Sequence, residues 1–467
     1  MMIHSYTPLA LSLIAGVLGS VWAQGKVIDD GPQHLNEMSS IGESLRNLGP
    51  HPLHILYVHG MDAMGAGDSR AFQEGICAFL KGCQVPAGPV DRDYADSGEF
   101  QNGAPPPAFD YMGKPVWSST EQWSASAPFV DHYVLTRSGN APVVVDEINW
   151  WPLVFPFKCR NIIPGEARLA GPDADLLNMC SNPTVQDAHH PGRFTAYQWL
   201  APQEAASLKS MPHRGALANR LLKNNILDWG VSDAFLAVGS MRNLFREGMR
   251  KLFVKSARFR ADGSKTNEWL QQLKNPQGID RGFIVVSHSL GSYLVFSTLD
   301  MGEQDAGSNN ASAGPQSGLA EKQEEDAAAQ YILERTSLAY FFANQVPLLE
   351  LATMEAAATS ELTRAEADAP PKPAVALSKR MKRWSDLRQS FQRKRAGTEQ
   401  SAAQPPQVLS FSDPSDLLTW RIPEIEGLKV DNLYVRNTWL HWLVANPAPA
   451  HRNYARNRNV LQIMMGP

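Results

Sequence analysis

The serine at position 289 stands where a nucleophile could form. The stretch Phe283–Phe296 reads F-I-V-V-S-H-S-L-G-S-Y-L-V-F, in which an apolar strand turns sharply into an apolar helix. A serine at such a turn is well presented, and a neighbouring base can activate it by taking its proton. The turn forces unusual backbone angles, so the residues two before and two after the serine must be small. Ser287 and Gly291 occupy these positions, and the pattern therefore predicts a nucleophile at Ser289.

Three other short motifs accompany this stretch: V-H-G-M at 58–61, F-S-D-P-S-D-L-L at 411–418 and A-H-R-N-Y at 450–454. Together with S-H-S-L-G at 287–291, they make the chain resemble the α/β-hydrolase family of serine esterases and lipases. The resemblance runs from about residue 54 to the C-terminus, with two interruptions. The order Ser, Asp, His along the chain is also the order of that family.

The resemblance implies a role for each motif. Ser289 would attack the substrate carbonyl, and the backbone N–H groups of Leu290 and Met61 would form the oxyanion hole. The base would follow the acid in the chain, which leaves His441 and His451. His441 lies in the apolar segment W-L-H-W-L, which is typical of a packed core histidine. His451 lies in A-P-A-H-R-N-Y, and the resemblance favours it, with His441 as the alternative base.

The acid has two candidates. Asp413 and Asp416 both follow the apolar strand V-L-S-F-S. Asp416 precedes Leu417 and Leu418, as the family's acid often precedes apolar residues, while Asp413 is closer to the strand end. We expect Asp416 to orient the histidine ring, with Asp413 as the alternative acid. The other aspartate could cap the next helix.

Short apolar strands and helices alternate along the chain, which favours a mostly parallel sheet covered by helices on both faces. The expected strands are 54–60, 132–137, 143–150, 283–286, 337–343, 408–412 and 432–436, and the expected helices are 69–80, 214–227 and 241–253. The resemblance described above implies the α/β-hydrolase fold, with its core beginning in 24–91 and continuing in 281–467. Residues 92–280 would hold an inserted cap region with some core elements.

Two stretches of small, polar and charged residues, at about 302–329 and 356–407, are predicted to be flexible insertions because they can bury little apolar surface. Within the second, residues 377–395 combine one apolar helical face with many basic side chains. Such a helix could contact an anionic membrane, or it could rest on the domain.

The N-terminus favours export. An apolar run over 9–18 and small or medium residues at Val21 and Ala23 are typical of a signal peptide spanning 1–23. A helix packed on the domain is the alternative. In an exported chain, periplasmic or secreted, four cysteines suggest disulfides, with local pairing of Cys77 with Cys83 and of Cys159 with Cys180. The alternative is four buried thiols, and the spacings match no common zinc site.

The 467 residues carry a net charge of −4, which argues against nucleic acid as a partner. We expect no metal or organic cofactor. The expected function is hydrolysis of a small-molecule or lipid carboxylic ester through an acyl-enzyme. An amidase or thioesterase using the same residues, or a binding protein without catalysis, is the alternative.

Two remaining features are ambiguous. The adjacent carboxylates Asp146 and Glu147 could serve a glycosidase, or they could be half-exposed residues of a sheet. The apolar run W-W-P-L-V-F-P-F at 150–157 could line an acyl pocket or form a lid, or it could be ordinary core.

Overall fold

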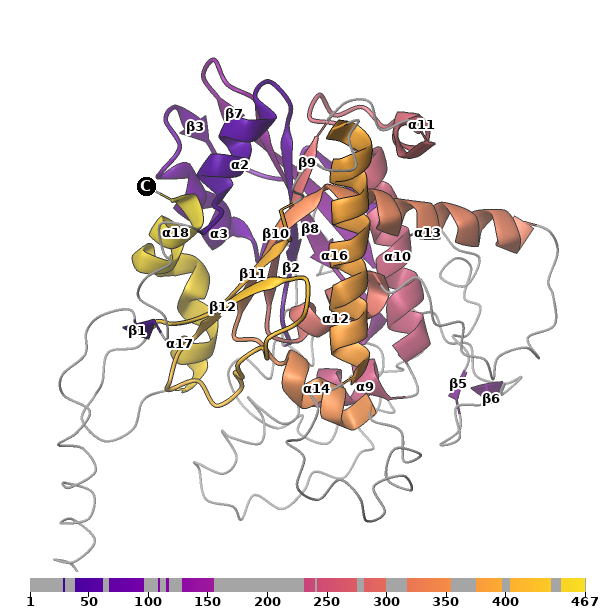
Figure 1. The fold of residues 1–467 in the computed structure, drawn as a ribbon, viewed down its shortest axis with the longest axis vertical. Helices are drawn as coiled ribbons and strands as arrows, with labels where there is room; N and C mark the ends of the chain where they lie inside the picture. Colours follow the sequence, from indigo (N-terminus) through magenta and orange to yellow (C-terminus); the bar gives the residue numbers. More distant parts are fainter. Residues whose placement is uncertain are drawn as a thin grey trace, which may run out of the picture.

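A central, mostly parallel sheet with helices on both faces organises the molecule (Figure 1). The structure is a computed structural model that describes residues 28–29, 38–61, 67–95, 108–109, 115–116, 128–154, 231–239, 242–274, 281–299, 317–353, 375–396, 404–437 and 447–466. The mostly parallel sheet between helices confirms the predicted α/β class. The predicted segments 1–23 and 214–227 lie outside the described residues.

The sheet runs in the order β1-β12-β11-β10-β9-β2-β8-β7-β3, with β4 also paired to β7. The neighbours from β12 to β8 are parallel, while β7 is antiparallel to β8. The strands are β1 Ile28–Asp29, β2 Leu53–Val58, β3 Cys83–Gln84, β4 Asp91–Tyr94, β7 Phe129–Arg137, β8 Val143–Asn149, β9 Gly282–His288, β10 Thr336–Phe342, β11 Gln407–Ser412 and β12 Lys429–Tyr434. A separate two-stranded sheet pairs β5 Ala108–Phe109 with β6 Pro115–Val116.

Helices form a layer on each face of the sheet (Figure 1). On one face lie α2 Ile41–Leu48, α3 Arg70–Cys77, α17 Pro447–Arg452, the 3₁₀ turn Asn453–Arg456 and α18 Arg458–Met465. On the other lie the 3₁₀ turn Trp151–Leu153, α9 Ser232–Val238, α10 Arg242–Arg258, α11 Glu268–Lys274, α12 Leu290–Leu299, α13 Ser317–Arg335, α14 Val346–Thr353 and α16 Val375–Ala396.

Strand β9 shows how the sequence supplies both layers. Phe283 and Val285 belong to the core on the side of α10 and α12, whereas Ile284 and Val286 belong to the core on the side of α3 and α18. Successive side chains of a strand point to opposite faces, so a strand buried on both faces must be apolar throughout. The uninterrupted run F-I-V-V meets that requirement.

The strand order reverses beside β2. From β2 the chain reaches β8 on one side of it, and it then returns to place β9 on the other side. The sheet grows outward from β9 through β10 and β11 to β12. In open parallel sheets, the crevice at the carboxyl ends of the strands where the order reverses is the usual place for a ligand. Here that place lies after Val58 and His288.

The two predicted flexible insertions are partly wrong. Residues 317–329 of the first belong to helix α13, which packs on α10 and buries Ala328 and Ala329. Residues 375–396 of the second form α16, which packs on α13. Small alanines let helices approach closely, so a segment with few large apolar residues still gains a buried face.

Helix α16 carries the basic segment that the sequence offered to a membrane. Its apolar side chains Met381, Trp384 and Phe391 are buried in the protein, and Trp384 Nε1 donates a hydrogen bond to the Thr336 carbonyl at 3.1 Å. Any contact of α16 with an anionic membrane would therefore rest on its basic side chains. Within the described ranges, no helix has the length and apolar character needed to cross a bilayer.

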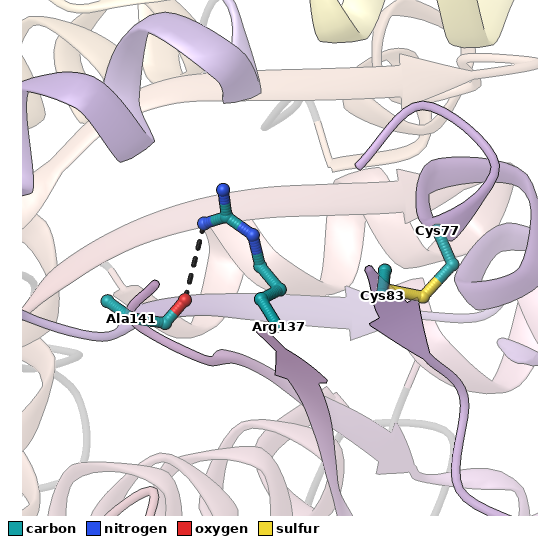
Figure 2. The surroundings of a disulfide bond; sticks show 4 residues. All are labelled: Cys77, Cys83, Arg137 and Ala141. Atoms are coloured by element: carbon teal, nitrogen blue, oxygen red, sulfur yellow. Dashed lines mark hydrogen bonds between the residues drawn. A yellow bond between two sulfur atoms is a disulfide. The ribbon is translucent and has the colours of Figure 1, made fainter. Parts of the chain in front are cut away.

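A disulfide joins Cys77, the last residue of α3, to Cys83 on β3 (Figure 2). The edge strand β3 pairs with the end of β7, where Arg137 Nη1 donates to the Ala141 carbonyl at 3.2 Å. The bond thus ties a helix on one face of the sheet to its edge. Cys159 and Cys180 lie outside the described residues.

Candidate active site

Ser289 occupies the sharp turn between β9 and α12. Its backbone has φ = 55°, which lies in the left-handed region that residues other than glycine rarely adopt. The N–H of Ser289 donates to the Phe342 carbonyl at the end of β10, 2.7 Å away, and holds this conformation in place. A strained residue fixed by its surroundings is a frequent feature of active sites.

The small residues around Ser289 are used in different ways. Ser287 is buried, and its hydroxyl lies 2.9 Å from that of Ser292 in the first turn of α12. A side chain at Gly291 would place its Cβ 2.5 Å from the Val58 carbonyl oxygen, which leaves room for glycine alone. The turn therefore accepts serine two residues before Ser289 and requires glycine two residues after it.

His451 connects Ser289 to a carboxylate. Its Nε2 lies 3.0 Å from Ser289 Oγ, and its Nδ1 lies 2.9 and 3.0 Å from Oδ1 and Oδ2 of Asp416. With Nδ1 protonated and donating to the carboxylate, Nε2 is left to accept the serine proton. The structure thus brings together the three side chains that the sequence ranked first. His441 lies outside the described residues.

The two aspartates after β11 have different partners. Oδ1 of Asp416 also accepts the N–H of Leu418 at 2.9 Å. Asp413 accepts the N–H of Ser415 at 2.7 Å and that of Asn437 at 2.5 Å, so its carboxylate organises the loop. Among the described residues, no hydrogen bond joins Asp413 to His451.

Gly60 brings the loop after β2 against the serine. An added Cβ would lie 2.7 Å from Ser289 Cβ and 3.1 Å from the His288 carbonyl oxygen, so the position admits only glycine. Met61 is the next residue and packs, partly buried, on the core cluster to which Leu290 also belongs. Leu290 is the first residue of α12, and N–H groups of a first helical turn have no partner within the helix. Both predicted oxyanion donors therefore lie next to Ser289. Met61 follows Gly60, which packs against Ser289, and Leu290 follows Ser289 in the chain.

Trp150 and Glu147 bind the two ends of the segment between β2 and α3. Trp150 Nε1 donates to the His59 carbonyl at 3.0 Å, and the two rings stack with centroids 4.8 Å apart. The Glu147 carboxylate accepts the N–H groups of Gly67 and Ser69, at 2.7 and 3.0 Å, where the loop enters α3. The described part of the 150–157 run, Trp150 to Val154, is therefore core.

Asp146 and Glu147 do not form a glycosidase pair. Both are fully buried rather than half-exposed, and as neighbours on β8 they point to opposite faces of the sheet. Asp146 lies 3.1 Å from Nδ1 of His54 and 2.6 Å from Nδ1 of His132. Burial raises the pKa of Glu147 to about 7.

His288, the last residue of β9 and the neighbour of Ser289, supports the base. Its Nε2 donates to the backbone carbonyl of His451 at 2.6 Å. Burial, and to a lesser extent the neighbouring His451, lowers the pKa of His288 to about 4. A ring that stays neutral at ordinary pH adds no charge beside His451 and fixes the backbone that carries it.

Tyr454 is a site residue that the sequence reasoning missed. It lies three residues after His451, and its hydroxyl contacts the acid loop. The spacing gave a signal, because side chains three apart in a helical segment share a face.

No group of His, Cys, Asp and Glu in the described part of the chain could hold a metal ion. Comparisons with protein-family models, curated proteins and solved structures found no match to this chain.

Proposed function

We propose that the chain is a serine hydrolase of the α/β-hydrolase type that cleaves carboxylic esters through an acyl-enzyme. The observation that carries the proposal is the position of His451, whose two ring nitrogens lie 3.0 Å from Ser289 Oγ and 2.9 Å from Asp416 Oδ1. A nucleophile in contact with a base that a third group orients is the recognised signature of covalent catalysis.

The first half of the reaction forms the acyl-enzyme. Ser289 Oγ attacks the ester carbonyl carbon while His451 Nε2 takes the hydroxyl proton, and Asp416 stabilises the resulting imidazolium. The carbonyl oxygen becomes an oxyanion that accepts hydrogen bonds from the N–H groups of Met61 and Leu290. The C–O bond to the alcohol then breaks, and His451 gives its proton to the departing alcohol oxygen.

The second half restores the enzyme. Water attacks the acyl carbon, again losing a proton to His451 Nε2, and a second oxyanion forms at the same place. The bond to Ser289 Oγ breaks, the carboxylic acid leaves, and the serine regains its proton from His451. Every proton removed is returned within the cycle, so the reaction needs only the ester and water.

Two features of the fold support the α/β-hydrolase assignment. Ser289 and Gly60 follow β9 and β2, the adjacent strands at which the sheet order reverses, where ligands usually bind. The three reactive side chains also occur in the order serine, aspartate, histidine, as in that family.

Labelling with a fluorophosphonate probe tests the proposal directly. Wild-type protein should be labelled at Ser289 and should hydrolyse p-nitrophenyl esters, and a series of acyl lengths would define the preferred substrate. Ser289→Ala should lose labelling and at least about 10⁴-fold in kcat. Ser297→Ala is a matched control, because Ser297 lies farther along α12 and its hydroxyl donates to the Leu294 carbonyl. A folded wild-type protein that is neither labelled nor active would favour a binding protein.

We also propose that the protein is exported. The disulfide between Cys77 and Cys83 supports this, since such bonds persist in oxidising compartments. Non-reducing peptide mapping of natively produced protein should recover that linked pair, together with Cys159 joined to Cys180. Four reduced thiols in the native protein would contradict the export proposal and leave the hydrolase proposal intact.

A further inference from the structure

A second candidate site lies at the opposite end of the central strands from Ser289. A cavity of about 310 Å³ opens at the amino ends of β2, β9 and β10, beside α2 and the C-terminal part of α16. Its wall is rich in polar side chains, including Ser39, Ser44, Asn47, Ser337, Gln392 and Gln404. A polar cavity at the small end of the usual range for ligand pockets suits a compact polar molecule better than a lipid chain.

Four arginines line this cavity. Arg281 directly precedes β9, Arg335 ends α13, and Arg388 and Arg395 lie seven residues apart, on one face of α16. Glu43 of α2 is the single acidic residue among the lining residues. The cavity therefore has a strong excess of positive charge from three separate parts of the chain.

Two of the arginines are anchored by the protein. Arg281 Nη1 donates to the Ala257 and Phe259 carbonyls, at 3.2 and 2.6 Å. Arg335 Nη1 lies 3.6 Å from the Glu334 carboxylate, and its guanidinium lies 3.9 Å from the centre of the Tyr331 ring. These contacts fix both side chains in the cavity wall.

The other two arginines have no carboxylate partner within the described ranges. Arg388 Nη1 donates to the Glu334 carbonyl at 2.8 Å, whereas its buried Nε has no hydrogen-bond partner. Burial, and then the charges of Arg335 and Arg395, lower the pKa of Arg388 to about 10. Like charges gathered in a partly buried place destabilise the fold unless an anion offsets them.

We propose that this cavity binds a small oxyanion, the phosphoryl or carboxylate group of a small molecule, through the guanidinium groups of Arg388 and Arg395. A guanidinium presents paired N–H donors that match two oxygens of either group, and such charge-assisted bonds are the strong ones. The Nε of Arg388 has no hydrogen-bond partner, so this lining residue keeps an unused donor.

The anion site is separate from the candidate active site. Strand β9 connects them, because Gly282 lines the cavity at its start and Ser289 directly follows its end. A strand of this length spans roughly 20 Å. The proposal therefore stands or falls independently of the hydrolase proposal.

Titration with inorganic phosphate, in one arm, and with succinate, in the other, tests it on the whole protein. Binding is followed by calorimetry and by the thermal midpoint, with chloride added to match the ionic strength. We expect saturable binding of at least one of the two anions, and the preferred arm identifies the group. Arg388→Gln and Arg395→Gln should each weaken that binding at least about tenfold.

Arg393→Gln is the matched control, because Arg393 is an exposed residue of α16 that does not line the cavity. It makes the same change in charge two residues from Arg395, and it should bind the anion as wild type does. Arg395→Gln removes an exposed side chain, so its effect does not depend on whether Arg388→Gln folds. The proposal is wrong if neither anion binds saturably, or if all three variants bind alike.

Discussion

The Tyr454 hydroxyl donates a hydrogen bond to Oδ2 of Asp416, at 3.2 Å. The same hydroxyl accepts the backbone N–H of Asp413 at 2.7 Å, so a single phenol holds both ends of the acid loop. Burial, and then the charge of Asp416, raise the pKa of Tyr454 well above its usual value. The hydroxyl therefore remains a donor throughout the pH range in which the site would work.

Tyr454→Phe removes that hydroxyl and keeps the ring. We expect the free energy of unfolding to fall by about 1–3 kcal/mol, since the Asp413 N–H loses its acceptor. We also expect kcat for p-nitrophenyl ester hydrolysis to fall about tenfold, because Asp416 is held less firmly against His451. Urea denaturation and steady-state kinetics measure the two effects. An unchanged kcat would show that Tyr454 serves the fold alone.

The two aspartates should separate catalysis from stability. Asp416→Asn should lower kcat by about 10⁴-fold, because an amide can hold the histidine in the wrong tautomer. Asp413→Asn should instead lower the thermal midpoint, since an amide cannot accept both the Ser415 and Asn437 N–H groups as well as a carboxylate does. The larger loss of kcat at Asp413 would reverse the assignment of the acid.

Three glycines form a graded test of the turn. Gly60→Ala forces a Cβ to 2.7 Å from Ser289 Cβ, so it should reduce activity strongly. Gly291→Ala forces a Cβ to 2.5 Å from the Val58 carbonyl oxygen, so it should destabilise the fold by several kcal/mol. Gly88→Ala meets nothing within 4 Å and is the neutral control. Kinetics and melting curves distinguish the three, and a fully active Gly60→Ala would remove the support for Met61 as an oxyanion donor.

The buried histidine His132 should make stability depend on pH. It lies 2.6 Å from Oδ1 of Asp146 and 3.4 Å from Oδ2 of Asp93. Burial alone would lower its pKa, but the two carboxylates outweigh burial and raise it from 6.5 to about 9. Because the folded state holds this proton more tightly, the stabilisation is fully present below about pH 6.5 and is lost as pH rises through about 9.

We therefore expect the free energy of unfolding to fall by about 3 kcal/mol between those two pH values. Urea denaturation at a series of pH values measures the slope. His132→Gln should flatten it, while His51→Gln, which removes an exposed histidine outside the network, should preserve it. Equal slopes for wild type and His132→Gln would contradict the assignment.

The sequence predicted the sheet and the turn at Ser289 well because both depend on local patterns. An apolar strand followed by small residues and a helix is readable without knowing any partner. The choice between Asp413 and Asp416 was harder, since it depends on contacts with residues such as Tyr454 that lie far along the chain. The first part of helix α13 was misread because the buried apolar residues described there are Ala328 and Ala329, and alanine carries little hydrophobic signal.

Contacts between distant segments were beyond the sequence. The pairing of Asp146 with His54 and His132 follows from the register of three neighbouring strands. The arginine cavity likewise arises where α13, α16 and β9 meet. Charged residues such as Asp146 and Arg388 give no signal in the sequence, because their role depends on neighbours that come together only in the folded chain.

The backbone contacts at the ends of three parallel strands form a series. The N–H of Ser289 donates to Phe342 at the end of β10, and the N–H of Ala343, next along, donates to Phe411 near the end of β11. The place of the serine relative to the loop that carries Asp416 is therefore set across the strands, and the chain between the strands does not set it. Segments joining β9, β10 and β11 can accordingly lengthen or shorten during evolution while the serine and the acid keep their spacing.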